Sequence, residues 1–204
     1  IERRQITISQ DRDLVPGERN MAMLTYTNVN TVYFRMVEVT GRYDNRQDET
    51  TMLSELGYLT PVAEWSVRVN NPGDWLEHYT IVEIPPVMQG KYYLLASTGQ
   101  YFNSGDCIAY EYVECNSIGL ARMISGSGAL SGVTVNTKSG TAIPSCRYTV
   151  WQLNNQDEQV RVAAQGFSAD DGFLSVEGLR NGRYMMELEN NESKGNCIFN
   201  IPWV

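Results

Sequence analysis

The four cysteines are the residues of this chain best suited to metal binding or covalent chemistry, and their spacing argues against a metal. Cys107, Cys115, Cys146 and Cys197 are separated by 8, 31 and 51 residues. Structural zinc sites usually draw ligands from close pairs such as C-x-x-C. Four cysteines allow three disulfide pairings in an oxidising compartment, whereas a buried thiol packs as a small hydrophobic group. We expect buried thiols or at most one disulfide.

His78 is the single histidine, so every catalytic triad built on histidine must include it. It stands in an alternating segment beside Thr80 and Val82, which favours a partly exposed histidine on a strand. The sequence contains no G-x-S-x-G motif, phosphate-binding loop or dinucleotide fingerprint. The glycine-rich segment GSGALSG, residues 126–132, lacks the lysine of a phosphate-binding loop and is typical of a flexible connection.

Carboxylates could bind a hard cation or cleave a glycosidic bond. Asp170 and Asp171 precede Gly172, and this order is more typical of a turn than of a calcium site. Among the 24 acidic residues no spacing selects a catalytic pair. We therefore expect no catalytic residue, no cofactor-binding residue, no metal ligand and no bound cofactor.

Aromatic residues could form a sugar-binding platform on a sheet. The chain has twelve tyrosines and four tryptophans, which are Trp65, Trp75, Trp151 and Trp203. Aromatic residues are also enriched in strands because they pack well on a pleated surface. In CRYTVWQL, Tyr148 and Trp151 must face opposite sides of a strand, so at most one of them faces outward. Glycan binding or adhesion therefore stays an alternative hypothesis.

Composition excludes further classes of function. The net charge of −8 and a pI near 4.7 disfavour nucleic acid as a partner, because phosphate binding needs clustered basic residues. Hydrophobic residues make up 42% of the chain, and no apolar run is long enough to span a bilayer, so we expect no membrane insertion by this segment. The first residue is Ile1, which favours a processed protein or a piece of a longer one.

An internal repeat organises the strands that must position these residues. GKYYLLA at 90–96 returns 92 residues later as GRYMMEL at 182–188. An offset of this size indicates two tandem domains, and we place them at 1–101 and 102–204, with QYFNSGD at 100–106 as the linker. The repeat predicts that Tyr92 and Tyr184 occupy equivalent places.

Alternating segments predict an all-β fold of two tandem antiparallel β-sandwiches. In the segment 31–39, Val32, Phe34 and Met36 share one face, and apolar groups on both faces favour a central strand. MLSEL at 52–56 suits one helical turn or a short strand, and no helix of ordinary length is expected. Asn181 and Gly182 give a hairpin signal. The other predicted strands lie at 3–9, 21–29, 61–69, 75–84, 90–98, 107–115, 117–124, 133–137, 146–153, 158–166, 173–179, 182–188 and 196–203.

The order of these segments resembles a known family. DLVPGERNMAMLTYTNVNTVYFRMVEV and PGDWLEHYTIVEIPPVMQGKYYLLAST are similar to the amino-terminal part of alpha-2-macroglobulin-like proteins of Bacteroidetes-type bacteria. CIAYEYVECNSIGLARMI, GVTVNTKSGTAIPSCRYTVWQL and DDGFLSVEGLRNGRYMMEL are similar to the macroglobulin domain that follows there. A pattern of DG, an aromatic residue and GxY also occurs in other extracellular immunoglobulin-type repeats.

The resemblance implies a structural role. Alpha-2-macroglobulin-like proteins are broad-range protease inhibitors, and many capture the protease through a Cys-Gly-Glu-Gln thioester. None of the four cysteines stands in that motif. The resemblance therefore implies a non-catalytic scaffold in the periplasm or at the cell surface. Its partners are neighbouring macroglobulin domains of the same longer chain, with target proteases engaged mainly elsewhere.

Overall fold

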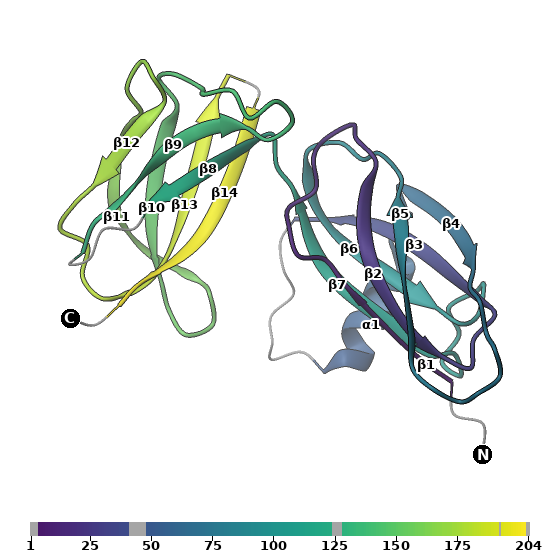
Figure 1. Ribbon diagram of the computed structural model, residues 1–204. Coiled ribbons are helices and arrows are strands. Elements are labelled where there is room, and N and C mark those ends of the chain that lie inside the picture. The colour runs from purple at the N-terminus through teal and green to yellow at the C-terminus, as the bar shows by residue number, and fades with distance from the viewer. Residues whose placement is uncertain (1–3, 41–47, 124–127, 192, 203–204) are drawn as a thin grey trace. The chain divides into compact units, whose positions relative to one another are not determined.

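The computed structural model describes residues 4–40, 48–123, 128–191 and 193–202. The chain divides into two compact units, Ile1–Cys115 (unit 1) and Asn116–Val204 (unit 2). Within the described residues, each unit contains seven strands in two antiparallel sheets (Figure 1). The predicted all-β fold of two tandem β-sandwiches is therefore confirmed.

Unit 1 packs a three-stranded sheet against a four-stranded sheet. The smaller sheet has the order β1-β2-β5, with β1 Gln5–Ser9, β2 Asn20–Thr27 and β5 His78–Ile84. The larger sheet has the order β4-β3-β6-β7, with β4 Ala63–Arg68, β3 Thr31–Val39, β6 Gly90–Ser97 and β7 Ile108–Cys115. Its core includes Leu24, Phe34, Met36, Ile84 and Leu94. As predicted, Val32, Phe34 and Met36 share the inward face of a central strand.

Unit 2 repeats this topology strand for strand. Its smaller sheet has the order β12-β9-β8, with β12 Phe173–Val176, β9 Leu130–Asn136 and β8 Ile118–Met123. Its larger sheet has the order β11-β10-β13-β14, with β11 Gln159–Phe167, β10 Arg147–Leu153, β13 Gly182–Asn190 and β14 Ser193–Ile201. The core includes Ile118, Val150, Leu174, Met186 and Phe199.

The paired tyrosines occupy equivalent places, as the repeat predicted. Tyr92 in β6 donates its hydroxyl hydrogen to the carbonyl of Met88 at 2.9 Å, four residues upstream. Tyr184 in β13 donates to the carbonyl of Arg180 at 2.8 Å, again four residues upstream. Both rings are buried, and each lies where the chain crosses from the smaller sheet to the larger one. This arrangement is the tyrosine corner of immunoglobulin-like sandwiches.

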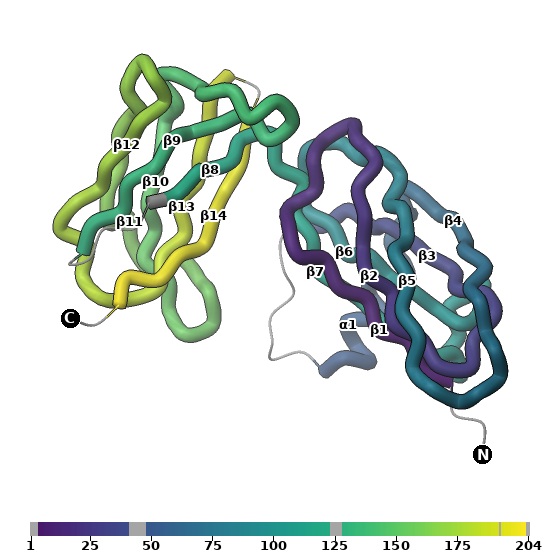
Figure 2. Tube along the Cα trace, viewed as in Figure 1, coloured from purple at the N-terminus to yellow at the C-terminus, as the bar shows by residue number. Residues whose placement is uncertain are grey.

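The division between the units falls after Cys115, not after residue 101. The segment CIAYEYVEC was predicted to open the second domain, but β7 pairs with β6 over its whole length, from Ser97 opposite Ile108 to Gly90 opposite Cys115. Figure 2 shows β7 beside β6 and β1 before the chain continues into β8. The polar segment 100–106 is accordingly the loop of the β6–β7 hairpin rather than a linker, because hairpin loops and linkers share a composition.

A helix interrupts the strands of unit 1, contrary to the expectation that none of ordinary length would form. α1 spans Glu49–Tyr58 and buries Met52 and Leu56, which are four residues apart and so share one face. The Asp48 carboxylate caps the helix by accepting hydrogen bonds from the Thr51 amide at 2.9 Å and the Thr51 hydroxyl at 2.6 Å. The helix lies on the outer face of the four-stranded sheet (Figure 1).

Two further predictions of local structure were wrong. Trp75–Glu77 were assigned to a strand, but β5 begins at His78, and Trp75 has a left-handed backbone with φ of 63°. Asn181 and Gly182 were assigned to a hairpin, but β12 pairs with β9 while β13 pairs with β10 and β14. The chain therefore changes sheets at this glycine, and the hydrogen bond of Tyr184 secures that change.

Candidate functional site

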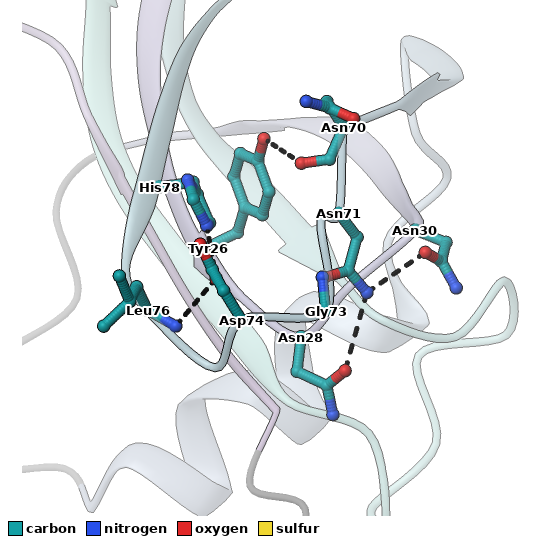
Figure 3. A network of polar contacts seen from close by, with 9 residues as sticks. All are labelled: Tyr26, Asn28, Asn30, Asn70, Asn71, Gly73, Asp74, Leu76 and His78. Carbon is teal, nitrogen blue, oxygen red and sulfur yellow. Dashed lines mark hydrogen bonds and ion pairs between the residues drawn. The ribbon is translucent and has the colours of Figure 1, made fainter.

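The single histidine begins β5 and pairs with an acid in the preceding loop (Figure 3). His78 Nε2 lies 2.9 Å from Asp74 Oδ1, and the same oxygen accepts the amide hydrogen of Leu76 at 3.0 Å. The hydrogen bond from His78, followed by that from Leu76, lowers the pKa of the Asp74 carboxyl. The pair therefore fixes the loop at the start of β5.

Neighbouring polar contacts tie this loop to the turn between β2 and β3. Tyr26 lies beside His78, with ring centroids 5.9 Å apart, and its hydroxyl donates to the Asn70 carbonyl at 2.8 Å. The Asn71 amide donates to Asn30 Oδ1 at 3.1 Å and approaches Asn28 Oδ1 at 3.5 Å (Figure 3). These contacts join two loops at one end of unit 1.

This network lacks the parts of a catalytic triad. An activated nucleophile requires a hydroxyl or thiol within hydrogen-bond reach of the histidine. None of the nine residues in Figure 3 is a serine, threonine or cysteine, and the Tyr26 hydroxyl is committed to a backbone carbonyl. His78 is half-buried on a strand, as its sequence context indicated, and the role that its contacts support is structural.

All four cysteines lie within the described residues, and each is a thiol. Cys115 and Cys146 are buried, and Cys107 and Cys197 are half-buried. Burial, with a smaller contribution from Asp13, raises the pKa of Cys115 to about 11, and burial also raises the pKa of Cys146. Because the thiolate is the reactive form, these two buried thiols are poor nucleophiles at neutral pH. The sequence left thiols or one disulfide open, and the structure has four thiols.

The acidic turn in unit 2 is built by its own backbone. Asp171 Oδ1 accepts the Phe173 amide hydrogen at 2.9 Å, and the Gly172 amide donates to the Ala169 carbonyl at 2.9 Å. Asp170 is exposed in the same turn. In the part of the chain that the structure describes, no three or more histidine, cysteine, aspartate or glutamate side chains are grouped to hold a metal ion.

The three described tryptophans differ in their surroundings. Trp65 faces the core of unit 1 and stacks on Phe34 with ring centroids 5.2 Å apart. Trp75 is exposed in the loop before β5, whereas Trp151 lies in unit 2 and donates its indole hydrogen to Glu187 Oε2 at 2.8 Å. Trp203 lies outside the described residues. A sugar-binding platform made of tryptophans is therefore not formed by the three that are described.

Two half-open surface pockets lie among the described residues of unit 1. The first, which we call the aromatic pocket, has a volume of about 370 Å³. The second, the asparagine pocket, has a volume of about 310 Å³. Tyr33 lines both. The aromatic pocket is also lined by Arg35, Glu64, Ser66, Tyr101 and Phe102, and the asparagine pocket by Arg4, Asn28, Asn30, Thr31 and Thr98.

Sequence reasoning did not select these pocket residues. Arg35 and Glu64 are 29 residues apart and meet only because β3 and β4 pair in one register. The available signal was the pair of aromatic residues Tyr101 and Phe102 within a polar loop, but that loop was interpreted as a linker. Its aromatic residues return to the sheet because the loop closes a hairpin.

No protein-family model matches the sequence. No curated protein matches it either. In the part of the chain that the structure describes, no helix has both the length and the apolar character to cross a membrane.

Solved structures share the fold at low sequence identity. A fragment of native alpha-2-macroglobulin from Escherichia coli that spans domains MG0-NIE-MG1 aligns with a TM-score of 0.61 and 14% identity over 98% of this chain. This chain spans 64% of that fragment. A shorter fragment of the same protein, spanning NIE-MG1, aligns with a TM-score of 0.56 and 14% identity over 95% of this chain and 96% of the fragment. The chain therefore has the β-sandwich fold of alpha-2-macroglobulin domains.

Proposed function

We propose that this chain is a non-catalytic structural segment of a large alpha-2-macroglobulin-like inhibitor of proteases. The observation that carries the proposal is the tandem pair of sandwiches, which aligns with the two-domain NIE-MG1 fragment over 95% of this chain and 96% of that one. In this proposal residues 1–115 and 116–204 are successive macroglobulin-like domains, each closed by its own tyrosine corner.

The chemistry of the described nucleophile candidates supports a non-catalytic role. Cys115 and Cys146 are buried and have raised pKa values, which disfavour the thiolate. The Asp74–His78 pair secures a loop rather than a nucleophile. In this proposal the segment contributes two compact sandwiches, and no catalytic group, to a longer protein.

Neighbouring macroglobulin domains of the same chain are the expected partners, and target proteases are engaged mainly elsewhere. The full protein acts in the periplasm or at the cell surface of a bacterium, of the Bacteroidetes type. The similarity in fold to a bacterial alpha-2-macroglobulin supports the assignment to bacteria.

Treating the full-length protein with a panel of proteases tests the proposal. Cleavage sites are mapped by mass spectrometry, and protease activity is then measured on a large protein substrate and on a small peptide. We expect cleavage outside residues 1–204, with loss of activity on the large substrate and retention on the peptide. Rapid cleavage within either sandwich, or unchanged activity on the large substrate, would contradict the proposal.

A further inference from the structure

The two pockets of unit 1 form a site whose size and polarity suit a small ligand. Their volumes of about 370 Å³ and 310 Å³ fall at the lower end of the range for small-molecule sites, roughly 300–1,000 Å³. Tyr33 lines both, so the two pockets lie next to the same residue of β3. A ligand with two linked units could therefore place one on each side of Tyr33.

Cross-strand pairs supply the polar floor of the aromatic pocket. In the ladder between β3 and β4, Arg35 lies opposite Glu64 and Tyr33 opposite Ser66. Arg35 Nε donates to Glu64 Oε1 at 2.6 Å, and 23% of the Arg35 side chain and 55% of the Glu64 side chain are exposed. The ion pair thus presents a guanidinium donor and a carboxylate acceptor side by side, with their charges balanced.

The β6–β7 loop supplies an aromatic wall. Phe102 has a left-handed backbone with φ of 54°, which is uncommon for a bulky residue and persists only where the surroundings enforce it. The Arg35 guanidinium lies 4.4 Å from the centre of the Phe102 ring. The neighbouring Tyr101 is 74% exposed, so its ring is available at the pocket's rim.

Contacts within the loop hold this wall in place. The Thr98 amide donates to the Cys107 carbonyl at 3.1 Å, and the Asn103 amide donates to Asp106 Oδ2 at 2.8 Å. A side chain at Gly99 would collide with the Asp106 carboxylate, so glycine lets the loop fold over that acid. These contacts fix the conformation of the loop that carries Tyr101 and Phe102.

Amides and hydroxyls dominate the asparagine pocket. Asn71 donates to the side-chain oxygens of Asn28 and Asn30, which fixes the orientation of both amides. In Figure 3 the amide nitrogens of Asn28 and Asn30 point away from Asn71. Thr31 and Thr98 line the same pocket, and the Thr98 hydroxyl oxygen accepts the amide hydrogen of Cys107 at 3.0 Å, which leaves the hydroxyl hydrogen to donate.

We propose that these two pockets bind a neutral glycan, with successive sugar units on either side of Tyr33. A sugar ring combines hydroxyls, which pair with amide, carboxylate and guanidinium groups, with an apolar face that packs on an aromatic ring. The Arg35–Glu64 pair balances its own charge, so Arg4 of the asparagine pocket is the one other charged residue among the described residues that line the two pockets, and the net charge of −8 disfavours a polyanion. This inference goes beyond the proposed scaffold function and does not depend on it.

Screening the 204-residue protein against an array of neutral oligosaccharides, followed by calorimetry with the best binder, tests this inference. We expect a disaccharide or longer glycan to bind more tightly than its monosaccharide. Tyr101→Ala should weaken binding at least about tenfold, because a stacked aromatic ring is lost. Ser66→Trp, at an exposed position, should abolish binding by filling the aromatic pocket.

Tyr79→Ala is the matched control, because Tyr79 is also a highly exposed tyrosine, 79% accessible, and lies on the opposite sheet. It should leave binding unchanged. A flat response across the array would overturn the inference, as would full binding by both Tyr101→Ala and Ser66→Trp. Competition at this site by an extended peptide but by no glycan would also overturn it.

Discussion

The two four-stranded sheets share one strand order but differ in what lies on their outer faces. In unit 1, α1 covers Val37, Tyr93 and Leu95, which form a second small core with Met52 and Leu56. In unit 2, Trp151 and Met185 stand in the positions of Val37 and Tyr93, opposite each other on β10 and β13. Val162 and Ile198 extend this row and are 44% and 42% exposed. Among the described residues of unit 2, no helix covers this row.

The difference comes from one connection. Residues 40–62 join β3 to β4 and include α1, whereas residues 154–158 join β10 to β11 in a tight turn. That turn is held by the Asn154 amide hydrogen, donated to the Glu158 carbonyl at 3.0 Å. Polar residues also replace apolar ones on the open face, since Glu187 and Asn196 take the places of Leu95 and Tyr110. The exposed face is thereby partly adapted to water.

Removing the anchor of α1 should have the largest effect and should be confined to unit 1. Leu56→Ala should lower the free energy of unfolding of unit 1 by roughly 2–5 kcal/mol, because Leu56 is 1% exposed. Hydrogen exchange should then accelerate at Tyr93 and Leu95 but not at Met185. Leu59→Ala, at a leucine that is 38% exposed, is the control and should change little. Equal decreases in the free energy of unfolding from Leu56→Ala and Leu59→Ala would mean that α1 does not stabilise the sheet by covering it.

The tyrosine corners should show an intermediate effect of similar size in both units. Tyr92→Phe and Tyr184→Phe each remove one hydrogen bond and should cost about 0.5–1.5 kcal/mol. Denaturant unfolding of the single and double variants measures the decrease in the free energy of unfolding, and the decreases from the two separate units should add. Tyr79→Phe, at an exposed tyrosine, serves as the control. Strongly unequal losses at the two corners would contradict their equivalence.

The smallest effect should be a dependence of the helix cap on pH. Hydrogen bonds from the side chain and backbone of Thr51 lower the pKa of Asp48 below its ordinary value of 3.8. A lowered pKa in the folded state gives stability that is present above pH 3.8 and is lost as the pH falls through the folded value. The protection factors of the α1 amides, which correct exchange rates for their intrinsic dependence on pH, should therefore fall at acid pH.

Asp48→Asn keeps a capping oxygen without the ionisation, so it is the matched variant for the pH experiment. It should remove the acid sensitivity of α1 while preserving the helix at neutral pH. Unchanged acid sensitivity in this variant would assign the effect to another group, such as Asp74, whose pKa is also lowered.

Local patterns in the sequence predicted the features that depend on local geometry. The spacing of Gly90 and Tyr92, repeated at Gly182 and Tyr184, predicted that the two tyrosines occupy equivalent places, and both make a hydrogen bond to the carbonyl four residues upstream. Alternation placed Val32, Phe34 and Met36 on the inward face of β3 for the same reason. Both features are determined by residues that are close together in the sequence.

Features that depend on distant pairing were not predictable in this way. The boundary was misplaced because the pairing of β7 with β6 cannot be inferred from the composition of either strand. The helix was missed because α1 buries only two apolar side chains, Met52 and Leu56, among polar ones. The aromatic pocket depends on the register that sets Arg35 against Glu64, which no local spacing reveals.

The connection between the third and fourth strands of each unit has a consequence for how such chains can diversify. Residues 40–62 and 154–158 join corresponding strands, yet the ladders on both sides of the connection keep the same partners. Because lengthening a surface loop changes its closure entropy only slowly, this point can accept added sequence without disturbing either sheet. The connection between the third and fourth strands can therefore hold a helix, a binding loop or only a short turn while the strand order of both sheets stays the same.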